Sequence, residues 1–347
     1  MLEKQTNNMR KVALAAGIYS GAALGLMTWP ASGWGAAILA GLYILRRRGL
    51  VGRLTSHGSA RWAERRDLKR AGMLGAKSGL ILGRVRKTRE LIRLPQAVHT
   101  SIFAPSGAGK GVSLIIPLLL QSGASKVVVD FKGELWKETA EHRRKNFGHQ
   151  IVVLDPFHSV TDKPDTFDPI AEILKDDPQA IDSCNDLGSA LVTKTGEEKE
   201  PHWNQAAEMF IAGIAAAVVK FGEKPAGTRS IQMVRETLVN PRRVDSTIQL
   251  MMKEGGEALA QMGSQLTHFT GDEKGSVLTT VNRHLTFLGS PSVMESTRTT
   301  SFDASQLRKG KMTVYLILPP DRAAAQAGLM RMWISSLMRA CVREGLQ

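Results

Sequence analysis

A glycine-rich stretch near residue 105 has the residue types and the spacing of a loop that binds phosphate. It reads Ala-Pro-Ser-Gly-Ala-Gly-Lys and ends at Lys110. Gly107 and Gly109 allow the backbone to curl so that amide N–H groups converge on an anion. The ammonium of Lys110 would reach the terminal phosphates, and a helix that follows would point its positive end at them. The spacing predicts a nucleotide site made of Ala104, Pro105, Ser106, Gly107, Ala108, Gly109, Lys110 and Gly111.

Gly111 is the one departure from the usual pattern of such a loop. A serine or threonine normally follows the lysine, and its hydroxyl ligates Mg²⁺. Ser113 lies two residues later, which turns its side chain by roughly 200° on a helix, so it is not a direct replacement. Phosphate binding by the backbone and by Lys110 does not need that hydroxyl. We therefore expect ATP to bind, with Mg²⁺ held through the nucleotide and its placement left open.

The segments on either side of the loop predict the elements that position it. Residues 99–104 read HTSIFA and predict a strand, and residues 111–121 predict a helix that Pro117 ends or kinks. A strand, this spacing, a lysine and a helix together indicate a nucleotide loop more strongly than the glycines alone. The alternative is a structural turn whose lysine is merely solvated.

Two short apolar runs follow the loop, and each ends in an aspartate. The runs KVVVD and QIVVLD end at Asp130 and Asp155, and a helical pattern separates them. Alternating strands and helices predict a parallel sheet covered on both faces, with both aspartates at its carboxyl edge, where ligands gather. Neither run carries the adjacent Asp-Glu pair that would both contact a metal and position a water molecule.

Residues 176–290 are dominated by helical patterns. Residues 206–221 are apolar but include Glu208, so we predict a core helix and not a membrane span. Asp177 followed by Pro178, and Asn240 followed by Pro241, each predict a helix start with the proline at the first helical position. The histidines lack the spacing of a metal site, and two cysteines provide neither a disulfide framework nor a metal cluster.

The amino-terminal end of the 347-residue chain predicts a membrane anchor. An uncharged run over residues 12–29 is about long enough to span a bilayer, and a second apolar run covers residues 33–45. Positive charge flanks both outer ends, which predicts a hairpin with both ends in the cytoplasm. A cleaved signal peptide, or a buried soluble helix for the shorter run, are the alternatives.

The net charge of +14 is concentrated in one segment. Residues 46–93 carry fifteen Lys and Arg against three acids, whereas residues 94–347 carry 28 of each sign. Anionic lipid headgroups are sufficient to explain a basic segment beside a membrane, although nucleic acid would also be attracted to it.

The order of these motifs resembles that of TraG-type coupling proteins, the P-loop ATPases of type IV secretion and conjugation. The resemblance is carried by the apolar hairpin, HGSARWA, FAPSGAGKGVSLIIPLLL, VVVDFKGELWKETA, VLDPF, HWNQAAEMF and FDASQLRKGKMTVYLILPPDR. Gly111 then looks like a family variant. The resemblance implies that the DFKGE segment, with Asp130 and Glu134, lies next to the nucleotide. It also implies that the catalytic Asp-Glu strand would follow beyond Gln347, so ATPase activity of this chain alone stays open.

The resemblance implies an α/β fold: a RecA-like parallel sheet with an inserted all-helical domain and an N-terminal transmembrane hairpin. The expected domains are a membrane anchor (1–48), a basic juxtamembrane segment (49–94), a nucleotide-binding domain (95–175 and 291–347) and a helical region (176–290).

The implied function is that of a hexameric inner-membrane ATPase with a cytoplasmic body, which drives single-stranded DNA with its relaxase, or protein substrates, into a type IV secretion channel. Arg283, Arg298 and Arg322 are candidate arginine fingers, although solvated or ion-paired roles explain each of them as well. Two further functions stay open: a substrate receptor of the same channel that does not hydrolyse ATP, and an FtsK-like translocase of double-stranded DNA.

Overall fold

The computed structural model describes residues 31–47, 61–95, 99–194, 196–224 and 226–342. The chain divides into two compact units, Met1–Glu64 and Arg65–Gln347. In the first unit, helix α2 (Ala31–Arg47) contains the second of the two predicted apolar runs, and the first run lies outside the described residues. Within the described ranges, no helix combines the length and the hydrophobicity needed to cross a bilayer.

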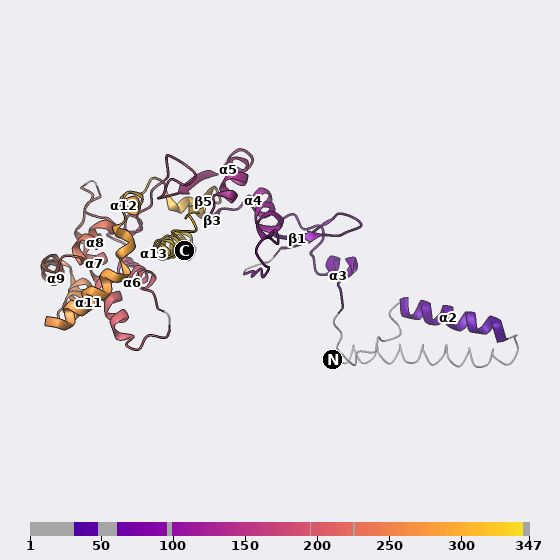
Figure 1. The fold of residues 1–347 in the computed structure, drawn as a ribbon, viewed down its shortest axis with the longest axis horizontal. Helices are drawn as coiled ribbons and strands as arrows, with labels where there is room; N and C mark the ends of the chain where they lie inside the picture. The colour runs from indigo at the N-terminus through magenta and orange to yellow at the C-terminus, as the bar shows by residue number, and fades with distance from the viewer. Residues whose placement is uncertain (1–30, 48–60, 96–98, 195, 225, 343–347) are drawn as a thin grey trace. The chain divides into compact units, whose positions relative to one another are not determined.

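The second unit contains the strands and the remaining described helices (Figure 1). The strands are β1 (Leu80–Arg84), β2 (Leu91–Leu94), β3 (Lys126–Asp130), β4 (Gln150–Leu154) and β5 (Met312–Ile317). The α-helices are α3 (Arg65–Arg70), α4 (Ile116–Gln121), α5 (Glu134–Phe147), α6 (Ala180–Leu191), α7 (His202–Phe221), α8 (Ile231–Leu238), α9 (Pro241–Glu254), α10 (Glu257–Leu266), α11 (Gly271–His284), α12 (Pro291–Ser296) and α13 (Ala327–Val342). Three further helical turns are η1 (Gly111–Ile115), η2 (Thr286–Gly289) and η3 (Ala304–Leu307).

The central sheet is parallel and has the strand order β3-β5-β4. Its middle strand, β5, is buried at every position and comes from far along the chain. Asp130 lies level with Ile317, and Leu154 lies level with Leu316, so Asp155 follows its strand at the same carboxyl edge as Asp130. The predicted α/β fold with a parallel sheet is confirmed. A separate antiparallel pair is formed by β1 and β2.

The two faces of the sheet bury different side chains, because successive residues of a strand point to opposite sides. One face carries Val128, Val153 and Tyr315, which pack with Leu119 of α4 and Ala140 of α5. The helix that follows the phosphate loop and α5 therefore cover the same face.

The opposite face of the sheet packs against the helical region. Val152, Leu154, Val314 and Leu316 belong to the large core that includes Trp333 of α13. Helices α6 and α7 contribute to this core as well. The two covered faces are those that the alternation of strands and helices predicts.

Helix α7 is the centre of the helical region. It contacts α6, α8, α9, α10 and α11, and most of its residues are buried. The core helix predicted over residues 206–221 is therefore confirmed. The predicted start of α9 is also confirmed, because Pro241 is its first residue and the Asn240 side chain accepts hydrogen bonds from the Arg242 and Arg243 amides. The start predicted at Asp177 and Pro178 is wrong by two residues, because the Asp177 carboxylate accepts from the Gln179 amide in a preceding turn and α6 begins at Ala180.

The strand predicted immediately before the phosphate loop is wrong. Residues 99–104 form no strand, and Phe103 is 94% exposed. A segment rich in β-forming residues becomes a strand only when a neighbouring strand supplies hydrogen bonds to its backbone. None of the described strands pairs with residues 99–104.

Candidate functional site

The phosphate loop has the backbone conformation that its glycines predict. Gly107 and Gly109 adopt φ values of 77° and 79°, in the left-handed region that residues with a Cβ rarely enter. The Ala108 amide donates to the Pro105 carbonyl at 3.3 Å, which closes the turn. The Ser113 amide donates to the Gly109 carbonyl at 2.8 Å, and the helical segment begins here. This curled backbone leads directly into a helix N-terminus, as an anion site requires.

The side chain of Lys110, the last residue of the motif, reaches back to the first two residues of the loop. Its ammonium donates hydrogen bonds to the carbonyls of Ala104 at 2.7 Å and Pro105 at 2.9 Å. These bonds hold a positive charge at the mouth of the loop. A bound phosphate would offer stronger, charge-assisted acceptors to the same ammonium.

The helix after the loop begins with a widened turn. Residues of η1 follow a π-helical pattern, in which the Ile116 amide donates to the Gly111 carbonyl. A Cβ at Gly111 would meet nothing within 4 Å, so the position has room for a side chain but provides no hydroxyl. The Ser113 hydroxyl lies 3.3 Å from where a Cβ on Gly109 would be, one turn further along the helix.

Arg143 anchors the far end of this helix, a role that the sequence did not reveal. Its guanidinium is fully buried, and it donates to the carbonyls of Leu119, Ser122 and Ala124, at and just beyond the end of α4. It also donates to the Thr313 hydroxyl on β5 at 2.7 Å. A cation at the C-terminal end of a helix is favourable, since the last carbonyls carry partial negative charge. The charged run EHRRK around Arg143 resembles a solvated helix face, and no local signal distinguishes the buried member.

His149 continues this polar cluster. Burial lowers the pKa of His149, so the neutral imidazole is favoured. Its Nε2 lies 2.9 Å from the Gly123 carbonyl, which fixes Nε2 as the donor, and its Nδ1 accepts from the Thr313 hydroxyl at 2.8 Å. Hydrogen bonds thus join the segment after α4 to the start of β5.

Asp130 and Glu134 lie where β3 turns into α5. The Asp130 carboxylate is buried and accepts from the Trp136 amide at 2.9 Å, while Glu134 is the first residue of α5. Gly133 between them has a φ of 73°, and a Cβ there would lie 2.2 Å from Val160 Cγ1. Asp130 therefore shapes the β3–α5 turn, and the sheet places it at the carboxyl edge.

Asp155 has a similar structural role at the end of β4. One carboxylate oxygen accepts from the Val160 amide at 2.7 Å and from the Thr161 amide at 3.3 Å. The other oxygen is buried without a hydrogen-bond partner. The loops that follow β3 and β4 are in contact through Gly133 and Val160.

The residues present fit a nucleotide better than they fit a metal held by the protein. The left-handed glycines, the lysine and the helix N-terminus match a polyphosphate. Within the described part of the chain, no group of three or more His, Cys, Asp or Glu side chains could hold a metal ion. The triphosphate itself would have to supply ligands to Mg²⁺.

The three candidate arginine fingers all lie at exposed positions. Arg322 pairs with Asp321 at 3.4 Å and lies over the Phe157 ring at 5.7 Å. That arrangement matches the ion-paired alternative for Arg322. Arg298 is exposed just after α12, and Arg283 lines a separate cavity.

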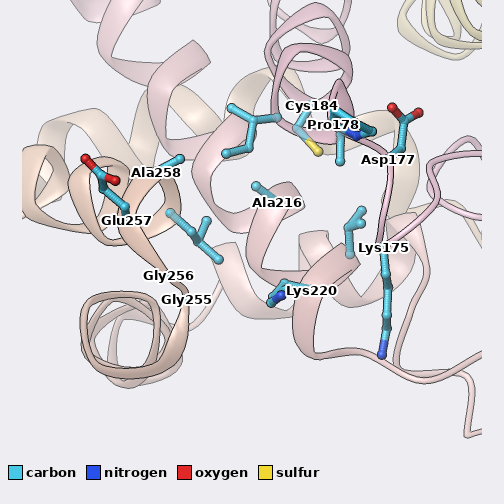
Figure 2. A pocket seen from close by; sticks show the side chains of 14 residues that line it. Lys175, Asp177, Pro178, Cys184, Ala216, Lys220, Gly255, Gly256, Glu257 and Ala258 are labelled. Carbon is cyan, nitrogen blue, oxygen red and sulfur yellow. The ribbon is translucent and has the colours of Figure 1, made fainter.

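A second cavity, of about 280 Å³, lies among α6, α7 and the turn between α9 and α10 (Figure 2). Cys184 and Ala216 contribute apolar walls, and Lys175 and Lys220 contribute charge. Lys175 is paired with Glu223 at 2.7 Å. None of the predicted site residues lines this cavity, so it is separate from the phosphate loop.

A family model described as "Type IV secretory system Conjugative DNA transfer" matches residues 61–345. The conjugal transfer protein TraG of Escherichia coli is 26% identical over 310 residues, which cover 82% of this chain and 48% of that protein. Protein VirD4 of Rhizobium radiobacter is 26% identical over 300 residues, covering 83% of this chain and 42% of that protein. The chain thus spans less than half the length of these relatives.

Solved structures of a conjugative coupling protein have a similar fold. TrwBdeltaN70 in an unbound form matches with a TM-score of 0.56 and 16% identity, over 84% of this chain and 62% of that chain. TrwB in complex with the ATP analogue ADPNP matches with a TM-score of 0.56 and 16% identity, over 79% of this chain and 59% of that chain. The structural likeness and the family match over most of the chain agree, and this chain belongs to the type IV secretory system conjugative DNA transfer family.

Proposed function

We propose that this chain carries the nucleotide-binding machinery of a coupling ATPase that drives DNA into a type IV secretion channel. The observation that carries the proposal is the phosphate loop, in which Gly107 and Gly109 are left-handed and Lys110 stands over the turn. The loop leads into a helix whose far end Arg143 ties to the central strand. Movement of the loop on nucleotide binding or hydrolysis would thus be transmitted to the sheet.

The ligand proposed for the loop is ATP with Mg²⁺. Structures of TrwB are described with ADPNP and with ADP and Mg²⁺, which supports the same ligand class here. Backbone amides and Lys110 would bind the phosphates, while Gly111 contributes no metal ligand. Asp130 and Glu134 are proposed as neighbours of the nucleotide at the carboxyl edge.

The membrane hairpin stays part of the proposal. Within α2, Leu39 and Tyr43 are 69% and 62% exposed, and Ile44 is 49% exposed. Such exposure of large apolar side chains on a helix is more compatible with lipid than with water. Together with the basic residues after position 45, this supports an anchor in the inner membrane with a cytoplasmic body.

The proposed substrates are single-stranded DNA with its relaxase, and the proposed assembly is a hexameric ring beside the secretion channel. The family description and the TraG, VirD4 and TrwB names support conjugative transfer. Residues 176–290 are proposed as the helical domain that faces the substrate. Since residues 94–347 carry equal numbers of acidic and basic residues, DNA contact should be local and not spread over the surface.

Nucleotide binding by the purified chain tests this proposal. We expect a fluorescent ADP derivative to bind, and the Lys110→Ala substitution to weaken binding at least about tenfold. Lys253→Ala, which removes an exposed lysine from α9, is the matched control and should leave affinity nearly unchanged. Unchanged affinity of the Lys110→Ala chain would contradict the proposal.

A receptor that docks substrates without hydrolysing ATP is the second candidate. Phosphate release stimulated by single-stranded DNA distinguishes the two functions. A motor releases phosphate in a Lys110-dependent manner, whereas a receptor binds nucleotide without release.

A further inference from the structure

The turn between β1 and β2 is exposed and basic. Two backbone hydrogen bonds of 2.9 Å close it, one from the Val85 amide to the Glu90 carbonyl and one from the Arg89 amide to the Val85 carbonyl. The residues between Val85 and Glu90 are all exposed, and Arg86 and Lys87 are among them. The connection between the two strands is thus tightly folded and presents its side chains to the surroundings.

The base of the hairpin is held by the body of the chain. Ile81 is buried, and β1 contacts both η1 and α4. Arg93 on β2 donates to the side-chain oxygen of Gln121 at the end of α4. Farther along the hairpin, residues 82–91 form what we name the hairpin tip, and none of them is buried. The hairpin tip is therefore a surface feature on a fixed base.

The hairpin tip carries positive charge that the described residues do not balance. Its acidic residue, Glu90, is already bound, because the Nε and Nη2 atoms of Arg65 donate to its two carboxylate oxygens at 2.7 and 2.8 Å. Four cations of the tip make no side-chain hydrogen bond or ion pair with a described residue: Arg84, Arg86, Lys87 and Arg89. Several uncompensated cations on one short segment attract a negatively charged surface.

Exposed leucines stand beside these cations. Leu91 lies opposite Arg84 in the strand register, so the two side chains share one face of the hairpin, and Leu91 is 38% exposed. Leu82, at the register shift between Ile81 and Gly83, is 43% exposed. Leucine next to Lys and Arg is typical of segments that lie in the headgroup layer of a bilayer. Nucleic acid does not need such leucines, since its phosphates bind cations and its bases stack on aromatic side chains.

We propose that the hairpin tip binds an anionic phospholipid surface, with its cations at the headgroup phosphates and with Leu82 and Leu91 toward the acyl chains. The inference rests on the proposed function in one respect, because the proposed membrane anchor would keep the tip close to a bilayer. It goes beyond that anchor, since the tip lies outside residues 1–48 and selects lipids by their charge.

The test follows a fluorophore on the hairpin tip of the full chain. An environment-sensitive nitrobenzoxadiazole label is attached at Thr88→Cys, and Cys341→Ser removes the exposed native thiol while Cys184 is buried. The chain is mixed with vesicles of phosphatidylcholine alone or of phosphatidylcholine with phosphatidylglycerol. We expect blue-shifted emission, and quenching by a quencher attached to lipid, with the anionic vesicles only. Salt at about 1 M should reverse both effects, because it shortens the screening length to about 3 Å.

Two double variants test whether the cations of the tip are responsible. Arg86→Gln with Lys87→Gln should lower the quenching by about half or more, since each cation near an anionic surface contributes to binding. Arg242→Gln with Lys253→Gln is the matched control, because it removes the same charge from exposed positions on α9 and should leave the quenching unchanged. All four positions are exposed, so both variants should retain the unfolding midpoint of the unsubstituted chain.

The proposal is overturned if the label does not respond to anionic vesicles, if it responds equally to both kinds of vesicle, or if the two double variants have equal effects. A response to oligothymidylate with none to anionic vesicles would also overturn it and would indicate a contact with nucleic acid. Flotation with phosphatidylcholine vesicles reports the membrane anchor separately. A chain that floats without a response of the label contradicts lipid binding by the tip alone, whereas a response to anionic vesicles in a chain that does not float with phosphatidylcholine contradicts the anchor alone.

Discussion

The guanidinium of Arg143 donates a hydrogen bond to the hydroxyl of Thr313 at 2.7 Å, although the two residues are 170 positions apart. The same guanidinium donates to three carbonyls at and just beyond the end of α4, which continues the helical segment that η1 begins after the loop. A single buried cation thus links the loop's helix to the central strand. Since no carboxylate is among these partners, the carbonyl groups and the helix dipole stabilise the charge.

Replacing Arg143 with methionine should destabilise the chain strongly. The substitution leaves the carbonyl groups of three residues and the Thr313 hydroxyl without their buried donor. We expect the free energy of unfolding to fall by about 3 kcal/mol or more in chemical denaturation. Arg144→Met is the matched control, because Arg144 is exposed and pairs with Glu141 on the surface. Equal loss of stability in both variants would show that the buried hydrogen bonds of Arg143 stabilise the chain no more than the exposed ion pair of Arg144 does.

Gly133→Ala should disturb the turn between β3 and α5. The new Cβ would lie 2.2 Å from Val160 Cγ1, and the φ of 73° adds backbone strain. We expect a loss of about 1–3 kcal/mol of unfolding free energy. Gly148 also has a positive φ, of 69°, but a Cβ at that position would meet nothing within 4 Å. The Gly148→Ala substitution therefore measures backbone strain without a steric clash. Adding Val160→Ala to Gly133→Ala should recover the part due to the clash, and no recovery would contradict this account.

The stability of the chain should depend on the ionisation of Asp168. Burial raises the pKa of Asp168 to about 7, although the carboxylate accepts from the Ile170 and Ile231 amides at 3.0 Å. The folded state then binds a proton that the unfolded state releases near pH 4. The contribution of the protonated Asp168 side chain to the free energy of unfolding is fully present below about pH 4 and is lost as the pH rises through about 7.

The substitution Asp168→Asn should reduce that pH dependence. Asparagine retains an oxygen that accepts from the two amides but does not ionise. Between about pH 5 and about pH 8, we expect the thermal unfolding midpoint of the Asp168→Asn chain to fall less than that of the unsubstituted chain. Burial also raises the pKa of Glu172. A smaller dependence of the unfolding midpoint on pH should therefore remain in the Asp168→Asn chain. Asp186→Asn, at an exposed position on α6, is the control and should preserve the original slope.

Gly111→Ser should alter how the loop uses Mg²⁺ without disturbing the fold. A Cβ at this position meets nothing within 4 Å, so we expect the unfolding midpoint to stay within about a degree or two. The new hydroxyl stands where phosphate loops usually provide a metal ligand. Nucleotide affinity measured with and without Mg²⁺ should then differ by a larger factor than in the unsubstituted chain. An unchanged Mg²⁺ dependence would indicate that the widened first turn of η1 keeps position 111 away from the metal.

Local patterns in the sequence predicted most of the elements that surround the phosphate loop. The runs ending at Asp130 and Asp155 form β3 and β4, and the glycines of the loop adopt the left-handed conformation that their spacing indicates. Helix α7 is buried as its composition predicts. These features depend on side-chain periodicity and on the conformational freedom of glycine, which are properties of short segments.

The strand predicted over residues 99–104 shows where local patterns are insufficient. Its composition favours a strand, yet a strand needs a partner, and the partner is decided by how distant segments pack. The position of β5 between β3 and β4 has the same origin, since β5 is separated from both by the whole helical region.

The sequence by itself determined the curled backbone of the glycine-rich loop, the strands β3 and β4 and the apolar helix α7, because each is encoded by neighbouring residues. Only the tertiary structure decided that Arg143 is buried against Thr313 and that Asp168 is shielded from solvent. A side chain's burial and its partners depend on residues far away in the chain, so the same arginine type can be solvated at one position and can hold a helix in place at another.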